Sequence, residues 1–266
     1  MNLDGAVSTL AALAAGVPER AGRVRLTSAD GVATLVIDNP ASRNALTLRM
    51  MSDLASAVAA LQSLPIVATL VVGEGDQSFC AGGQLDELLG AIDRPAAARA
   101  MCLAMGVVLD ALLDSGFVTI GAVDGPAVGG GAELVTALDH PIIGGRGWVH
   151  FAQVGLGIPT GWGGARRLVG RVGRNRALTV VLGDERLDGP AAATLGLASA
   201  TPGSARAACE AFAGKLRALP ASGVRGLKRQ VVAAGTGDRD ADATAFADAW
   251  GGLEHRAALS ARLGRR

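Results

Sequence analysis

Two glycine-rich segments carry the residues of this chain that are most suited to chemistry. Each follows an apolar, strand-like run and precedes a predicted helix: residues 79–85 read FCAGGQL and residues 128–133 read VGGGAE. Glycine lets a backbone approach a ligand closely, and the N–H groups at the start of a helix point outward as unpaired donors. Two such donor sites that grip one oxygen from two sides would form an oxyanion hole.

The same glycines have two other interpretations. Glycine-rich turns between strands and helices occur throughout α/β proteins, so a purely structural role stays open at this point. A dinucleotide site would need a full GxGxxG motif, which neither Gly73-x-Gly75 nor residues 129–131 supply. No acidic residue ends a second strand at the distance such a site requires. The spacing therefore disfavours a dinucleotide site.

Length and charge limit the class of protein. The chain has 266 residues, of which 50% are hydrophobic, so it can bury a large core as one domain with an appended element. Its 25 lysines and arginines nearly balance 24 aspartates and glutamates. Without an excess of positive charge, nucleic acid is not an expected partner.

Cysteine and histidine spacing argues against disulfides and metals. There are three cysteines with no close pairing and three dispersed histidines: Cys80, Cys102, Cys209, His140, His150 and His255. This pattern predicts neither a disulfide framework nor a metal site, and it fits a cytoplasmic protein. Residues 7–17 are apolar but too short to span a bilayer, and Asp4 precedes them where a secretory leader has a basic residue. We expect an amphipathic N-terminal helix there and no membrane partner.

The hydrophobic pattern predicts alternating strands and helices, followed by a helical tail. Expected strands cover 24–27, 32–37, 66–72, 117–123, 142–143 and 148–151, with a hairpin turn at Asp30-Gly31. A helix is expected behind Thr47, a predicted cap, and before Pro65, because apolar residues recur there at helical spacing: Leu46, Met50, Leu54, Val58 and Leu61. Further helices are expected over 95–113, from 165 onward and from 204 to the end, with a loop over 155–164. The predicted class is α/β. We divide the chain into an N-terminal helical extension (1–22), a core (23–200) and a helical C-terminal region (201–266).

Several motifs occur in a family-specific order. They are Asn39-Pro40, NAL (44–46), FCAGGQL (79–85), AVGGGAEL (127–134), FAQ (151–153), LGIP (156–159) and GWGG (161–164). In this order the chain resembles the crotonases, the enoyl-CoA hydratase/isomerase family, from about residue 24 to its end. The resemblance implies a spiral of ββα units, a helical C-terminal region used in trimer assembly and acyl-CoA substrates. It also implies a homotrimer or a dimer of trimers, with no cofactor beyond the CoA moiety of the substrate.

The resemblance assigns roles to particular residues. The backbone N–H groups of Gly83 and Gly130 would hold the thioester oxygen as it becomes an enolate oxygen. Five residues fall where the family lines its CoA channel: Arg43, Ala45, Ala81, Gln84 and Leu85. Arg43 either reaches a CoA phosphate or is a solvated surface arginine. Trp162 and Trp250 either wall the acyl pocket or fill core and subunit contacts.

The two acid/base positions of the family are only half present. Glu133 matches one of the two glutamates that hydratases use, and in an apolar pocket it would act as a proton donor; the alternative is a helix residue that completes local hydrogen bonds. The second position holds Gln153, which cannot exchange a proton at neutral pH. Gln84 replaces the aspartate that serves as a base in some isomerases. These departures argue against ordinary hydration.

Within the family, the chain resembles the acyl-CoA decarboxylases that act on ethylmalonyl-CoA and methylmalonyl-CoA. The residues that carry this likeness are AMC (100–102), GIP (157–159), WGG (162–164), VGRNRAL (172–178) and AWGG (249–252). Loss of CO2 makes the thioester enolate without a base, so decarboxylation suits the remaining groups. The leading hypothesis is therefore an acyl-CoA decarboxylase for short α-substituted malonyl thioesters. The alternatives are an enoyl-CoA hydratase or isomerase with one working glutamate, and a non-catalytic acyl-CoA-binding protein.

Overall fold

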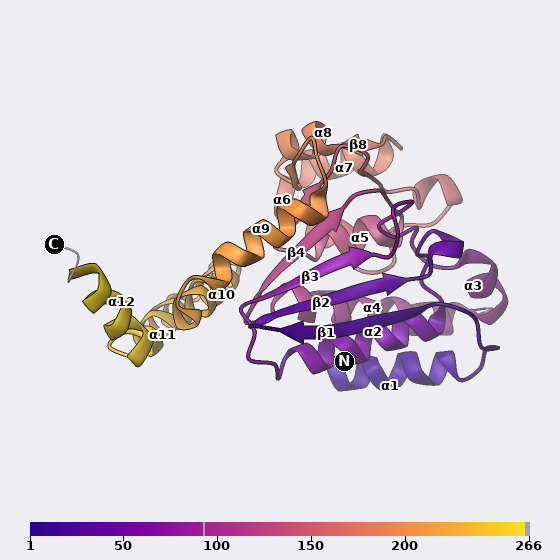
Figure 1. Ribbon diagram of the computed structural model, residues 1–266. Helices are drawn as coiled ribbons and strands as arrows, with labels where there is room; N and C mark the ends of the chain where they lie inside the picture. The colour runs from indigo at the N-terminus through magenta and orange to yellow at the C-terminus, as the bar shows by residue number, and fades with distance from the viewer. Residues whose placement is uncertain (93, 264–266) are drawn as a thin grey trace.

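A six-stranded sheet forms the centre of the protein, of which a computed structural model describes residues 1–92 and 94–263 (Figure 1). The strand order is β1-β2-β3-β4-β6-β9. The strands are β1 (Arg23–Ala29), β2 (Val32–Asp38), β3 (Ala68–Gly73), β4 (Val118–Val123), β6 (His140–Ile143) and β9 (Ser199–Ala200). β1 and β2 are antiparallel, and each later neighbour is parallel to the one before it.

The β1–β2 hairpin forms at the predicted turn. Asp30 and Gly31 have positive φ values of 50° and 76°, which is the backbone that a two-residue hairpin loop requires. The pairing starts beside the turn with Ala29 opposite Val32. The Asp30-Gly31 turn, which the sequence predicts, thus sets the register of the β1–β2 pair.

Two layers of helices cover the sheet. On one face lie α1 (Leu3–Ala14), α2 (Leu48–Leu61) and α4 (Pro95–Leu113), and on the other lies α9 (Ala205–Arg217). Every residue of β3 is buried, because alternate side chains face opposite layers: Val71 belongs to the cluster with α4, and Leu70 and Val72 belong to the cluster with α9. The continuous β-branched run of the sequence is therefore a buried parallel strand, as predicted.

The N-terminal helix is part of the core. α1 fulfils the expectation of a helix within residues 1–22, and its Ala6 and Leu10 are fully buried against the core cluster. α2 begins behind Thr47, whose hydroxyl accepts a hydrogen bond from the Met50 N–H at 3.1 Å. The predicted cap is confirmed.

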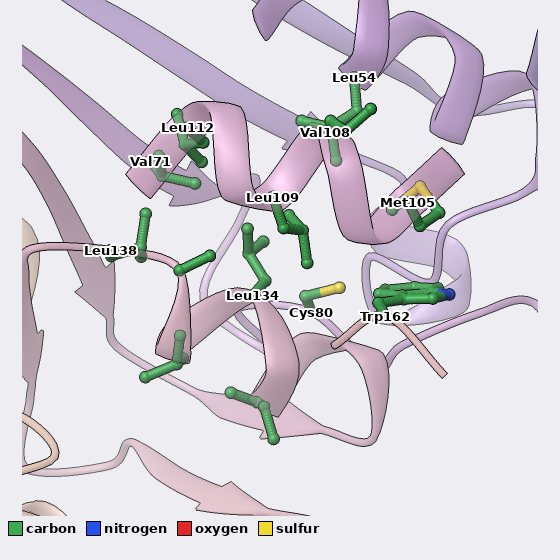
Figure 2. Packing of buried hydrophobic residues seen from close by; sticks show 14 of the residues in the cluster. Leu54, Val71, Cys80, Met105, Val108, Leu109, Leu112, Leu134, Leu138 and Trp162 are labelled. Carbon is green, nitrogen blue, oxygen red and sulfur yellow. The ribbon is translucent and has the colours of Figure 1, made fainter. Parts of the chain in front are cut away.

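α4 is the central helix of the main core cluster (Figure 2). It is long and apolar enough, by length and composition alone, to cross a membrane. Here it packs as a core helix: Met105, Val108, Leu109 and Leu112 are fully buried. Figure 2 places them between Leu54 of α2 and Leu134 of α5 (Gly130–Thr136).

A smaller sheet and further helices complete the body. The second sheet has three strands in the order β5-β7-β8. Its strands are β5 (Pro126–Val128), β7 (Trp148–His150) and β8 (Leu187–Asp188). The remaining helices of the body are α3 (Leu85–Ala91), α6 (Gly164–Val172), α7 (Arg174–Leu182) and α8 (Gly189–Leu195), with short 3-10 turns η1 (Pro40–Ser42) and η2 (Val154–Leu156).

The C-terminal region is helical, as predicted, and extends away from the body (Figure 1). It continues from α9 through α10 (Ala221–Thr236), α11 (Arg239–Ala249) and α12 (Leu253–Leu263); residues 264–266 of the predicted region lie outside the described residues. α10 is tied to the body by Lys228, which is buried and donates to the Asp139 carboxylate and to the Leu113 carbonyl. The helical region is thus anchored at its base by a buried ion pair.

Truncation of Leu109 tests the central position of α4. We expect Leu109→Ala to lower the free energy of unfolding by about 2–5 kcal/mol, because it leaves a cavity in a fully packed core. Leu103→Ala is the matched control on the same helix, where the residue is 43% exposed, and it should cost under about 1 kcal/mol. Urea unfolding followed by circular dichroism measures both. Equal losses in the two variants would contradict this packing.

Candidate active site

The two glycine-rich segments lie side by side beyond the carboxyl ends of β3 and β4. Cys80 and Ala127 form a parallel bridge, and the Val128 N–H donates to the Cys80 carbonyl at 2.9 Å. Gly82 has a φ of +92°, and a Cβ placed on it would lie 3.0 Å from the Gly130 nitrogen. Only glycine permits both the backbone conformation and this approach.

Each segment presents one backbone N–H that is not used internally. The Leu46 N–H donates to the Gly82 carbonyl and the Gln84 N–H donates to the Leu46 carbonyl. The Gly83 N–H between them has no acceptor in the part of the chain that the structure describes. α5 begins at Gly130, whose N–H also has no acceptor within residues 1–92 and 94–263. These are the two glycines for which the family resemblance predicts oxyanion donors.

Both glycines line a mostly apolar cavity of about 450 Å³. Apart from the glycines, its lining includes Ala81, Leu85, Leu88, Ala98, Met101, Cys102, Val128, Glu133, Ala152, Gln153, Leu156, Ile158, Pro159, Thr160 and Trp162. Leu156 and Ile158 are more than half exposed and belong to the loop after β7, whereas Trp162 is 4% exposed. The cavity is therefore closed on the side of Trp162 and open toward this loop.

Trp162 packs directly against the second glycine segment. A Cβ on Gly130 would lie 2.2 Å from the indole ring, so the ring occupies the space that any side chain at 130 would need. Figure 2 places the ring next to Cys80 and Met105. Trp162 thus forms a wall of the cavity, one of the two roles weighed for it.

The Glu133 carboxylate is saturated with hydrogen-bond donors. Its Oε1 accepts from the Gly161 N–H (3.0 Å) and from Gln153 Nε2 (2.8 Å), and its Oε2 accepts from the N–H groups of Trp162 and Gly164 (both 2.7 Å). The residue is 2% exposed. A proton-donating carboxyl needs an acceptor for its own O–H, and all four neighbours are donors. The expectation of a proton donor at Glu133 does not match this arrangement, in which Glu133 caps the N-terminus of α6.

Gln153, which the family resemblance assigns to the second acid/base position, lies next to Glu133. Its orientation is determined by the carboxylate, because only the amide nitrogen can donate to it. Gln153 is 6% exposed, and its Oε1 is buried without a hydrogen-bond partner in the described part of the chain. The second amide hydrogen remains available.

The expected CoA-channel residues divide into two groups. Ala81 and Leu85 line the cavity. Arg43, Ala45 and Gln84 lie in the segments behind it, where the Ala81 N–H donates to the Arg43 carbonyl at 3.1 Å. The Arg43 side chain is exposed.

Trp250 lies elsewhere in the structure. It follows α11 on the extended helical region, is 65% exposed and stacks on Phe246 at 5.3 Å between ring centres. The expectation that it walls the acyl pocket is wrong within one chain, because α11 is in the helical region outside the body. The sequence motif AWGG carried no information about which element holds it.

Cys102, Met101 and Thr160 line the cavity without having been predicted as site residues. The signal for the first two was weak, since they lie on the amphipathic α4 among many apolar residues. They reach the cavity because α4 packs near α5 in the same core cluster, where Leu109 lies close to Leu134 (Figure 2). No group of three or more potential metal ligands occurs among residues 1–92 and 94–263.

Comparison with known proteins identifies the architecture. The family model for enoyl-CoA hydratase/isomerase matches residues 27–246. The chain belongs to this family, the crotonases. The solved enoyl-CoA hydratase of Polaromonas sp. JS666 superposes on this crotonase with a TM-score of 0.82, 23% identity and coverage of 92% of this chain and 98% of that one, which supports the fold.

Two relatives of this crotonase are named ethylmalonyl-CoA decarboxylase. That of Danio rerio is 30% identical over 243 residues, which cover 87% of this chain and 80% of the relative. That of Xenopus laevis is 35% identical over 171 residues, which cover 64% of this chain and 57% of the relative. The match to the Xenopus protein thus spans little more than half of that protein's length.

Substitution of Glu133 tests its role as a cap. We expect Glu133→Gln to lower the free energy of unfolding by about 2–3 kcal/mol, because the new amide group turns an N–H toward buried donors. Amide hydrogen exchange at Gly161, Trp162 and Gly164 should accelerate at least about tenfold. Glu210→Gln, at an exposed position of α9, is the control. Unchanged exchange in Glu133→Gln would contradict the capping role.

Thiol reactivity tests the burial of the cavity wall. Burial raises the pKa of both Cys80 and Cys209 to about 12, so about one thiol in ten thousand is ionised at pH 8. Burial and the nearby Glu133 charge also raise the pKa of Cys102, but this thiol borders the cavity. We expect iodoacetamide to label Cys102 first, and butyryl-CoA to slow that labelling. Mass spectrometry measures it, and faster labelling at Cys80 would contradict the packing.

Proposed function

We propose that this protein decarboxylates short α-substituted malonyl-CoA thioesters, such as methylmalonyl-CoA or ethylmalonyl-CoA. One observation carries the proposal: two glycines whose N–H groups have no acceptor among the described residues line one apolar cavity, and the two acid/base positions of that cavity hold no free acid or base. Glu133 is occupied by four donors and Gln153 is an amide. Such a site favours a reaction that makes an enolate without removing a proton.

The reaction breaks one bond and forms another. The bond between the α-carbon and the carboxylate breaks, and its electron pair moves toward the thioester carbonyl to give an enolate while CO2 leaves. The N–H groups of Gly83 and Gly130 stabilise the enolate oxygen. A proton from water then bonds to the α-carbon and restores the thioester. Such preorganised donors matter most in a cavity with few competing waters.

The apolar lining supports the same choice of substrate. A malonyl carboxylate beside Met101 and the Trp162 ring would have few hydrogen-bond donors, so its conversion to neutral CO2 would be favoured. Gln153 also lines the cavity, where its second amide hydrogen would donate to this carboxylate and orient it. The name shared by the Danio and Xenopus relatives supports decarboxylation.

Three further expectations belong to this proposal. We infer a homotrimer or dimer of trimers, because the C-terminal region exposes large apolar side chains, including Phe246, Trp250 and Leu253. We infer that no cofactor is needed beyond the CoA of the substrate. A cytoplasmic location is inferred from the unpaired cysteines.

A three-substrate assay tests the proposal. Methylmalonyl-CoA, ethylmalonyl-CoA and crotonyl-CoA are incubated separately with the protein, and CO2 release and hydration are followed. We expect CO2 from at least one malonyl thioester and little hydration of crotonyl-CoA. Hydration without CO2 release would instead favour a hydratase with one working glutamate. CoA-thioester binding without any turnover would favour a non-catalytic acyl-CoA-binding protein.

The Gly130 position provides a sharper test. We expect Gly130→Ala to reduce kcat by at least about 10²-fold, because its Cβ collides with the Trp162 ring and displaces the donor N–H. Gly90→Ala is the matched control, since a Cβ there meets nothing within 4 Å. Steady-state CO2 release measures both. Full activity in Gly130→Ala would exclude Gly130 from the oxyanion hole.

A further inference from the structure

Arg167 is a buried arginine that the proposed chemistry does not use. It lies on α6, and its side chain is 2% exposed. Burial of a guanidinium group costs free energy unless its N–H groups find acceptors. A buried arginine is therefore expected to hold its acceptors in a defined arrangement. Its neighbour Arg166 has the same residue type, but its side chain is 66% exposed.

The guanidinium of Arg167 joins three parts of the fold. Nε donates to the Thr136 hydroxyl at the end of α5 (3.1 Å), Nη1 donates to the Asp110 carboxylate of α4 (2.9 Å), and Nη2 donates to the Trp162 carbonyl (2.5 Å). Burial lowers the pKa of Arg167, and the Asp110 bond opposes that effect. The planar fork of arginine suits this task, because its donors point in fixed and different directions.

The contact to Trp162 leads to the oxyanion site. The Trp162 N–H donates to Glu133 and its carbonyl accepts from Arg167, so both polar backbone groups of Trp162 are held. The indole ring fills the space against the Gly130 backbone. A shift of this tryptophan would therefore change the direction of the Gly130 N–H.

α5 and α6 are bound to each other at both ends. Glu133 of α5 caps the N-terminus of α6. From α6, Arg167 reaches the Thr136 hydroxyl, while Arg171 donates to the carbonyls of Thr136 and Leu138 after α5. Unpaired groups at each helix end are thus satisfied by side chains of the other helix.

We propose that Arg167 is a positioning residue of the oxyanion site, which fixes the Gly130 N–H through Trp162 and through the end of α5. The kinetic test of this inference rests on the proposed function. The positioning of the Gly130 N–H by Arg167 would affect any enolate that binds at the site, whichever reaction produces it. Arg167 itself does not line the cavity, and its contact with the lining is the hydrogen bond to the Trp162 carbonyl. By fixing the direction of the Gly130 N–H, Arg167 helps that group to stabilise the negative charge that develops on the thioester oxygen in the transition state.

The test uses one substitution at two adjacent positions. Arg167→Lys keeps the positive charge opposite Asp110 but cannot reach three acceptors in three directions. Arg166→Lys keeps a positive charge beside the same Asp110 carboxylate at an exposed position. We expect Arg167→Lys to lower kcat for the malonyl thioester at least tenfold with KM changed less than threefold. Arg166→Lys should match the unmodified protein in both constants.

A second readout does not depend on decarboxylation. Acetoacetyl-CoA forms an enolate that absorbs in the ultraviolet, and an oxyanion site raises that absorbance on binding. We expect Arg167→Lys to reduce the absorbance change at saturation at least threefold, while Arg166→Lys does not. Near-ultraviolet circular dichroism of a Trp148→Phe, Trp250→Phe background reports the order around Trp162 in the same variants.

The outcomes separate the two proposals. Unmodified kcat and absorbance in folded Arg167→Lys would overturn the positioning role. So would a loss of kcat with an unchanged enolate signal, because that pattern would mean that the oxyanion donors are intact and that the loss arises elsewhere. If the unmodified protein releases no CO2 but forms the enolate, the proposed function fails. The absorbance change in Arg167→Lys then still tests the positioning role of Arg167. Absence of the enolate signal in the unmodified protein would overturn the inference.

Discussion

The candidate site depends on one buried carboxylate. Glu133 collects four N–H donors that would otherwise be unpaired in a dry interior, and three of them belong to the backbone of residues 161–164. Among the described residues these three N–H groups have no other acceptor, so the carboxylate determines the path of the segment. The path in turn places the Trp162 ring over the Gly130 backbone. A residue type associated with proton transfer thus has a structural role at this position.

The space around the glycines constrains the sequence as strictly as the hydrogen bonds of Glu133 do. A Cβ on Gly131 would lie 2.0 Å from the Cys80 carbonyl, and one on Gly164 would lie 2.4 Å from the Glu133 side chain. Neither neighbour is a flexible side-chain tip that could move away cheaply. At Gly131 and Gly164, therefore, only a glycine backbone fits, and the lack of side chains at Gly83 and Gly130 exposes their donor N–H groups. Packing and the proposed chemistry therefore both require glycine in this part of the fold.

The chemistry proposed for the cavity is defined by what its polar groups can do. The Glu133 oxygens face donors, Gln153 cannot ionise, and burial keeps the Cys80 thiol protonated. What remains is a pair of backbone donors in an apolar enclosure, which can stabilise negative charge but offers no ready base. A substrate that carries its own leaving carboxylate fits this limitation.

Local sequence signals determined much of this protein. Asp30-Gly31 set a hairpin, Thr47 capped a helix, and the ordered motifs around Gly83 and Gly130 predicted both the family and the donor pair, because turn and cap chemistry is local. Contacts between distant segments were decided by the tertiary structure. In the folded chain Glu133 meets the loop before α6, and Arg167 connects three elements. The fold also places Trp162 in the site and Trp250 outside it. Burial and hydrogen-bond saturation arise from segments far apart in the chain, so residue type and spacing did not reveal them.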